Sequence, residues 1–170
     1  MKRTTVFVCM GLGLTALCAP VAMRVPVRIV YNPSDSVPRG WYRIAPADSL
    51  HADSIVLARL PEEAAALAAQ RGYLPAGIPL LKRVGAVAPQ RVCIDAASVR
   101  IDGVQVAVAR WADGLGRRLP IWQLCRSLSD GELFLLSSTN QASFDSRYFG
   151  PIDVAAVIGS AQPLWTWGTP

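Results

Sequence analysis

The chain has 170 residues, of which 52% are hydrophobic, and its formal net charge is +5. This length suits one domain and gives no reason to expect two hydrophobic cores. The basic residues are scattered and no basic run is interleaved with aromatic residues, so the sequence does not indicate nucleic-acid binding. A solvated surface with affinity for anionic lipid is the simpler interpretation of the positive charge.

The N-terminus holds most of the apolar excess. Residues 4–23 form a run of twenty without a charged side chain, preceded by Lys2 and Arg3. Twenty helical residues span roughly 30 Å, the thickness of the hydrocarbon core of a bilayer. We therefore expect a single transmembrane helix within residues 1–24 and one domain over residues 25–170. A cleavable signal peptide is the alternative, disfavoured because the run is long and residues 16–19 (Ala-Leu-Cys-Ala) make a poor cleavage site.

Basic residues flank this apolar run on both sides, with Arg24 and Arg28 beyond its far end. Basic residues favour the cytoplasmic side, and the short N-terminal segment is easily retained there. We therefore expect a single-pass protein of the inner membrane with its domain in the periplasm.

Short strands are predicted along most of the remaining chain. A helix is expected from Pro61 to residue 70 or 71, since proline occupies the first turn, two glutamates follow it and Gly72 comes after the last turn. The pair Asp102-Gly103 is a signal for a tight hairpin. Many short strands and one clear helix indicate a mainly β, antiparallel domain with one short helical insertion. The predicted strands cover residues 25–31, 41–44, 54–60, 80–88, 91–94, 99–101, 104–109, 132–137 and 154–159.

The sequence contains four cysteines. Cys9 and Cys18 lie in the apolar run, and Cys93 and Cys125 lie in the domain without a CxxC pattern or a histidine nearby. No metal site is therefore expected. If the domain faces an oxidising compartment, Cys93 and Cys125 can form a disulfide. Two unrelated buried thiols are the alternative.

Lys82 is the strongest candidate for a general base. The one histidine, His51, lies in a polar loop, and a lone loop histidine is more often a surface residue than a member of a catalytic triad. A lysine can replace histidine if desolvation lets it lose its proton near neutral pH, whereas arginine stays protonated. Only two of the 17 basic residues are lysines, Lys2 and Lys82, and Lys82 lies in the apolar segment 79–84. A strand-edge lysine that reaches solvent is the alternative.

Ser36 is the candidate nucleophile. It lies in a turn-rich segment, residues 32–40, that is bounded by prolines. A serine on such a turn can present its hydroxyl and a backbone N–H together, an arrangement that suits acyl transfer. A polar surface turn is the alternative.

Three separated segments resemble the sequence boxes of the S26 signal-peptidase family. Residues 33–38 (Pro-Ser-Asp-Ser-Val-Pro) are similar to its nucleophile box, and residues 80–84 (Leu-Leu-Lys-Arg-Val) to its lysine box. Residues 143–150 (Ser-Phe-Asp-Ser-Arg-Tyr-Phe-Gly) resemble a third box and give the most specific match, while residues 52–56 resemble a strand box more weakly. The resemblance covers residues 31–159 in the order of the family, and it implies an S26-like antiparallel β domain.

The resemblance implies a role for four residues by position. Ser36 resembles the nucleophile and Lys82 its general base. Ser34 resembles the serine whose hydroxyl joins the Ser36 N–H in the oxyanion hole. Ser143 resembles the serine that hydrogen-bonds the lysine amine. The family needs no cofactor or metal, so none is expected here.

Asp145 and Arg147 are similar to a structural ion pair beneath that site. The sequence also departs from the housekeeping enzymes: Val37 replaces a methionine, and one residue instead of two separates Ser36 from Pro38. The lysine box lacks its usual following Gly-Asp. The small size and residues 36–42 (Ser-Val-Pro-Arg-Gly-Trp-Tyr) look most like the conjugal-transfer maturation peptidases of the TraF type, which process pilin precursors and in some systems cyclise them.

The sequence thus predicts a membrane-anchored serine endopeptidase with a Ser36–Lys82 dyad. Its expected substrate is a pilin or another conjugative-transfer precursor, with hydrolysis and cyclisation both left open. The expected partners are that protein precursor and the lipid bilayer, with no nucleic acid and an open oligomeric state. Two alternatives remain: a general leader (signal) peptidase, and an inactive structural subunit of a pilus or secretion apparatus.

Overall fold

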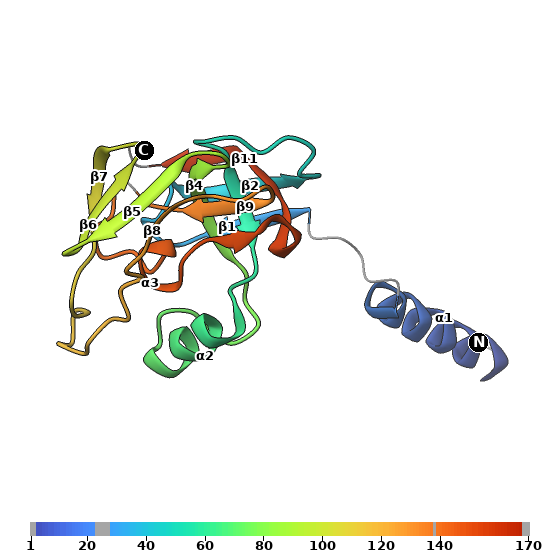
Figure 1. Cartoon of the computed structure of the whole chain (residues 1–170). Coiled ribbons are helices and arrows are strands. Elements are labelled where there is room, and N and C mark those ends of the chain that lie inside the picture. The colour runs from blue at the N-terminus through green and yellow to red at the C-terminus, as the bar shows by residue number, and fades with distance from the viewer. Residues whose placement is uncertain (1–2, 23–27, 138, 168–170) are drawn as a thin grey trace.

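The domain consists of two antiparallel β sheets. The computed structural model describes residues 3–22, 28–137 and 139–167. In spatial order, the larger sheet contains β1 (Ile29–Asn32), β2 (Arg39–Ala45), β11 (Val157–Trp167), β3 (Ile55–Ala58), β4 (Leu80–Val87), β9 (Glu132–Leu135) and β10 (Ile152–Asp153). The smaller sheet contains β7 (Val104–Val108), β6 (Ser98–Ile101), β5 (Arg91–Asp95) and β8 (Cys125–Ser127). The prediction of a mainly β, antiparallel domain is confirmed (Figure 1).

The helix α1 (Arg3–Ala22) occupies most of the stretch that was expected to anchor the chain. The side chains of residues 4–16 are exposed. Residues 1, 2, 23 and 24 of the expected anchor lie outside the described residues. Over the residues whose placement is described, no helix combines the length and the apolar content that crossing a membrane requires. The expected transmembrane helix therefore has no support from the structure.

The helix α2 (Glu62–Arg71) is the short insertion that the sequence predicts. It begins directly after Pro61 and ends at Gly72, whose φ of 72° lies in the left-handed region that favours glycine. The N–H of Gly72 closes the helix on the carbonyls of Ala68 and Ala69. Because β3 and β4 pair directly, α2 projects from the sheets between them (Figure 1). It is therefore placed to form a wall beside the larger sheet without taking part in it.

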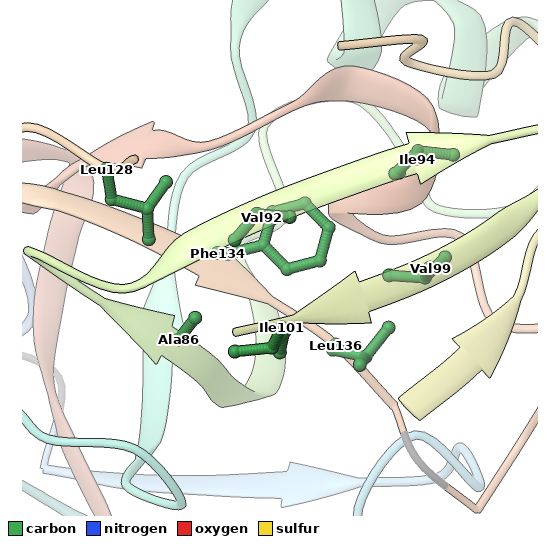
Figure 2. Packing of buried hydrophobic residues seen from close by; sticks show 8 residues of the cluster. All are labelled: Ala86, Val92, Ile94, Val99, Ile101, Leu128, Phe134 and Leu136. Carbon is green, nitrogen blue, oxygen red and sulfur yellow. The ribbon is translucent and has the colours of Figure 1, made fainter. Parts of the chain in front are cut away.

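The main hydrophobic cluster joins the two sheets. Its side chains come from β4 and β9 of the larger sheet and from β5 and β6 of the smaller one, and Figure 2 shows them facing one another. Burying such apolar surface is the principal term that stabilises a small domain. The buried members of this cluster are Ala86, Val92, Ile94, Val99, Ile101, Leu128, Phe134 and Leu136.

Several elements differ from the sequence-based expectation. Strand β8 and the one-turn helix α3 (Ser146–Phe149) were not predicted. The last predicted strand begins as a short 3-10 helix (Val154–Ala156) and then continues to Trp167, well beyond the expected end at residue 159. The long β11 pairs with both β2 and β3, so it joins the β1–β2 pair to the rest of the larger sheet.

Candidate active site

Asn32, at the end of β1, organises the turn that carries Ser34 and Ser36. Its side chain is 5% exposed. The amide Nδ2 donates to the carbonyl oxygens of Ser34, Val37 and Pro38 at 2.9, 3.0 and 3.2 Å. Its Oδ1 accepts from the backbone N–H of Ser34 at 3.2 Å and from the Ser34 hydroxyl at 2.9 Å. An asparagine that bonds the following backbone in this way fixes a turn whose polar groups no strand satisfies.

Lys82 reaches this turn from β4, an inner strand of the larger sheet. Strand β4 pairs with β3 on one edge and with β9 on the other, so backbone hydrogen bonds hold Lys82 in place. The lysine is only 4% exposed. Its Nζ lies 2.7 Å from Oγ of Ser36 and also contacts Oγ of Ser143. The fold thus brings together three side chains that the sequence analysis placed in separate boxes.

Burial changes the protonation of Lys82. Desolvation lowers the pKa of Lys82 from 10.5 to about 8, with the nearby positive charge of Arg147 acting in the same direction and the carboxylate of Asp145 opposing it. A lysine with this pKa is partly neutral near physiological pH. It can therefore accept a proton from a hydroxyl within hydrogen-bonding distance.

Two donors lie beside the Ser36 hydroxyl. Within the described part of the chain, the N–H of Ser36 bonds to no protein acceptor. The Ser34 hydroxyl lies 3.3 Å from Oγ of Ser36, but in this structure it also donates to Asn32. Because a hydroxyl has one hydrogen, the Ser34 hydroxyl must rotate away from Asn32 before it can donate to another acceptor beside Ser36.

Asp145 and Arg147 form a completely buried salt bridge next to the lysine. The guanidinium donates to the carboxylate twice, at 2.7 and 2.8 Å, and both side chains are 0% exposed. The remaining guanidinium hydrogens donate to backbone carbonyls, among them those of Ser143 at 3.0 Å and Val108 at 3.0 Å. A buried pair with this many bonds is costly to break on one side, because the partner would be left as an unpaired charge.

Ser137 is a site residue that the sequence analysis missed. It is 2% exposed, its hydroxyl donates to the carbonyl oxygen of Ser36 at 3.0 Å, and its N–H donates to Asp145 at 3.0 Å. The buried salt bridge thus binds the backbone of Ser137 and of Ser143, two residues whose hydroxyls contact Ser36 and Lys82 respectively. Neither Ser137 nor Asn32 belongs to a box, although the Asn-Pro-Ser sequence of residues 32–34 could have indicated the turn-forming role of Asn32.

A cleft of about 840 Å³ opens over Ser36 and Lys82. Tyr73, just after α2, hydrogen-bonds Asp113 in the loop after β7, so the segment that follows α2 and this loop form one wall of the cleft. This volume lies within the range of about 300–1,000 Å³ that is common for ligand-binding clefts. Most of its lining is apolar, including Leu57, Leu60, Leu74, Ile78, Leu80, Leu81 and Phe144.

Other residues considered in the sequence analysis lie elsewhere. His51 is exposed and does not line the cleft. A disulfide joins Cys93 and Cys125, which face one another across β5 and β8. Among the described residues, no group of three or more histidine, cysteine, aspartate or glutamate side chains is arranged to hold a metal ion.

Comparison with known proteins identifies the family. A match to the family described as "Signal peptidase, peptidase S26" extends over residues 1–167. The chain belongs to this family. The chain is also 37% identical to a probable conjugal transfer protein TraF of Sinorhizobium fredii over 150 residues, which cover 82% of this chain and 77% of the relative. It is 31% identical to a plasmid transfer protein TraF of Escherichia coli, with 98% of each chain covered.

The resemblance to the TraF type is therefore confirmed, and the chain is a member of a serine peptidase family. A signal peptidase I from Enterococcus faecalis, a solved S26 structure, matches with a TM-score of 0.40 and 17% identity over 66% of this chain and 97% of the other.

Proposed function

We propose that this S26 protein is an endopeptidase in which Ser36 is the nucleophile and Lys82 the general base. The observation that carries the proposal is the 2.7 Å separation of Nζ and Oγ at a lysine whose pKa burial lowers to about 8. An unprotonated amine at this distance can remove the hydroxyl proton as the oxygen attacks. The presence of both groups within hydrogen-bonding distance argues against an inactive structural subunit.

The reaction starts when neutral Lys82 accepts the Ser36 proton and Oγ attacks the scissile carbonyl. The resulting oxyanion accepts hydrogen bonds from the Ser36 N–H and from the rotated Ser34 hydroxyl. The Lys82 ammonium then gives its proton to the leaving amine, the C–N bond breaks and an acyl-enzyme remains. Ser143 keeps Nζ directed at Ser36 throughout, since its hydroxyl contacts the same amine.

The acyl-enzyme can be resolved in two ways. Water, losing a proton to Lys82, attacks the ester and releases a linear product. If the amine at the other end of the substrate reaches the ester instead, the product is a cyclic peptide. Both routes regenerate the Ser36 hydroxyl, and the products differ in mass by one water molecule.

We propose that the substrate is a pilin or another precursor used in conjugative transfer. The names of the TraF relatives support this substrate class, and the apolar lining of the cleft suits an apolar segment in extended form. A general leader peptidase has the same chemistry with a broader range of substrates. Comparison of the exported proteins of cells with and without the enzyme separates the two, since a general leader peptidase changes many of them.

We also propose that residues 1–24 attach the domain to the inner membrane, with residues 25–170 in the periplasm. The support comes from the sequence alone, in the twenty uncharged residues after Arg3. Carbonate extraction and protease treatment of spheroplasts test this arrangement. Release of the chain by carbonate contradicts the anchor, and full protection from external protease contradicts the periplasmic location.

The catalytic proposal is tested by co-expression with a pilin precursor and mass spectrometry of the product. The wild-type chain should shorten the precursor, and Ser36→Ala should leave it intact. Ser127→Ala is the matched control, because Ser127 is exposed on β8 and lines neither the cleft nor its surroundings. Equal processing by wild type and Ser36→Ala would refute the proposal.

A further inference from the structure

A second hollow of about 820 Å³ lies on the other side of the turn that carries Ser36. Ser34 and Ser36 line the first cleft, whereas Asp35 and Val37 line the second hollow. Alternate residues of the turn therefore face opposite hollows, and the turn is a wall between them. The second hollow is lined by Asp35, Val37, Pro38, Arg39, Arg110, Thr139, Asn140, Gln141, Ala142 and Trp167.

The two hollows adjoin one another. They share Arg110, Asn140 and Ala142 as lining residues, so a peptide can pass from one to the other along the rim of the wall. Ser36 and Lys82 line only the first cleft. The acyl part of a substrate, which stays bonded to Ser36, belongs in that cleft. A segment on the other side of the scissile bond can then enter the second hollow.

The second hollow carries an excess of positive charge. Its charged lining residues are Asp35, Arg39 and Arg110. Arg39 binds Asp35 through two hydrogen bonds, at 2.6 and 2.8 Å, so these two charges offset one another. With the residues that the structure describes, the Arg110 guanidinium makes neither a salt bridge nor a hydrogen bond. Arg110 is therefore available to a ligand.

The backbone of Arg110 is fixed although its side chain is exposed. Its N–H donates to the hydroxyl of Tyr148 at 3.0 Å, and Tyr148 is only 5% exposed. Two residues earlier, the carbonyl of Val108 accepts from the buried Arg147. The guanidinium thus extends from an anchored position at the junction of the two hollows.

We propose that the second hollow is the subsite for the leaving segment of the substrate, and that Arg110 selects segments that carry a carboxylate. The carboxylate is an aspartate or glutamate side chain close to the scissile bond, or the C-terminal carboxylate of a short leaving segment. A guanidinium binds either one through paired, charge-assisted hydrogen bonds. This inference rests on the proposed endopeptidase function, but it concerns binding and can fail independently of it.

The first test profiles cleavage sites with the full-length chain in detergent micelles. A proteome-derived peptide library is digested, and mass spectrometry records the residues on each side of every cut. Wild type should enrich aspartate and glutamate after the cut, or cuts close to the C-terminus. A parallel library with amidated C-termini separates these two sources of the carboxylate.

Arg110→Gln should remove the enrichment of acidic residues after the cut. Arg110→Glu should instead enrich lysine and arginine there. Arg100→Gln, an exposed arginine of β6 outside both hollows, is the matched control and should leave the profile unchanged. For one acidic peptide, Arg110→Gln should lower kcat/KM by about fivefold at low salt, mainly through KM, as expected for one partly exposed ion pair. A wild-type profile without acidic preference, or the same profile in Arg110→Gln, overturns the proposal.

A second test measures binding without cleavage. The full-length Ser36→Ala variant with ¹⁵N-labelled arginine is titrated with two acetylated tetrapeptides. The glutamate peptide carries an internal glutamate and a free C-terminal carboxylate, and the control peptide carries glutamine in the same place and an amidated C-terminus. The Arg110 side-chain signal should shift with the glutamate peptide alone, and the shift should shrink as salt is raised. Equal shifts with both peptides overturn the proposal. If the proposed endopeptidase function is wrong, the peptide library of the first test stays uncut, so the two failures can be told apart.

Discussion

Protonation of Lys82 is the property on which the proposed chemistry depends most directly, and it can be measured as a function of pH. With a pKa of about 8, roughly 9% of the amines are neutral at pH 7, against about 0.03% for a pKa of 10.5. Burial therefore increases the population of the active base by roughly 300-fold at pH 7. Below pH 8, kcat/KM should rise about tenfold per pH unit, and above pH 8 it should level off.

The lysine content of the chain makes the titration simple to read. The sequence contains only Lys2 and Lys82, so biosynthetic ¹³C labelling of lysine gives two signals at Cε. The Lys82 signal should titrate near pH 8. Ser36→Ala is the control that removes the nucleophile while the surrounding burial stays in place. If Lys82 titrates above pH 10 in an active enzyme, burial does not prepare the base and the reasoning is wrong.

The same pKa has a consequence for stability, and its sign follows from proton counting. Since the folded-state pKa lies below the unfolded-state pKa, the native domain holds fewer protons than the unfolded chain between about pH 8 and 10.5. The free energy of unfolding should therefore rise with pH across this window. Below pH 8 the cost of burying the ammonium is fully present, on the order of 3 kcal/mol.

Lys82→Met isolates this contribution. The free energy of unfolding in urea is measured for the wild-type chain and for the variant at several pH values. Subtracting one from the other cancels the contributions of the other titrating groups. The variant should be the more stable chain at pH 7, and its advantage should decrease above pH 8. A difference that stays constant from pH 7 to 10.5 would contradict the lowered pKa.

Three further outcomes follow from the site and its surroundings. Lys82→Arg should abolish processing of a co-expressed precursor, because a guanidinium keeps its proton. Circular dichroism checks that the variant is folded, and near wild-type turnover would exclude the dyad. Ser34→Ala should lower kcat by about 10²–10³-fold through loss of one oxyanion donor, and an unchanged kcat would show that its hydroxyl is not such a donor. Alkylation of the exported chain under non-reducing conditions should leave Cys93 and Cys125 unmodified, whereas two alkylated thiols would show that no disulfide forms in cells.

The sequence predicts the elements whose own residues favour the backbone conformation that the folded domain adopts there. Helix α2 has proline before it and glycine after it, and both act through backbone geometry that needs no distant partner. The hairpin between β6 and β7 forms at Asp102-Gly103, where both residues have positive φ as tight hairpin turns require.

Other elements depend on distant partners and carry little local signal. The second half of β11 contains Pro163, which ordinarily argues against a strand, and the pairing with β2 accommodates it by a shift in register between Pro163 and Trp165. Strand β8 has three residues, and its pairing with β5 defines it more than its composition does. Such strands exist because a partner is present, so a local pattern cannot reveal them.

The same distinction applies to the site. Lys82 stands out because the domain otherwise uses arginine, and Ser36 because it lies in a turn that resembles a known box. Ser137 acts through one hydrogen bond to the carbonyl of Ser36, a residue 101 positions earlier in the chain. Nothing in its immediate neighbours indicates that contact.

The proposed base and the proposed nucleophile occupy parts of the fold that differ in their tolerance to change. Lys82 lies on an inner strand, where an altered backbone would disturb β3 and β9 as well. Ser36 lies in a turn near the edge of the sheet, and turns accept changes of length and composition more readily than inner strands do. A protein engineer could therefore vary Asp35 and Arg39, exposed residues on either side of Ser36, to change which peptides are accepted, while Ser36 and the buried Lys82 stay unchanged.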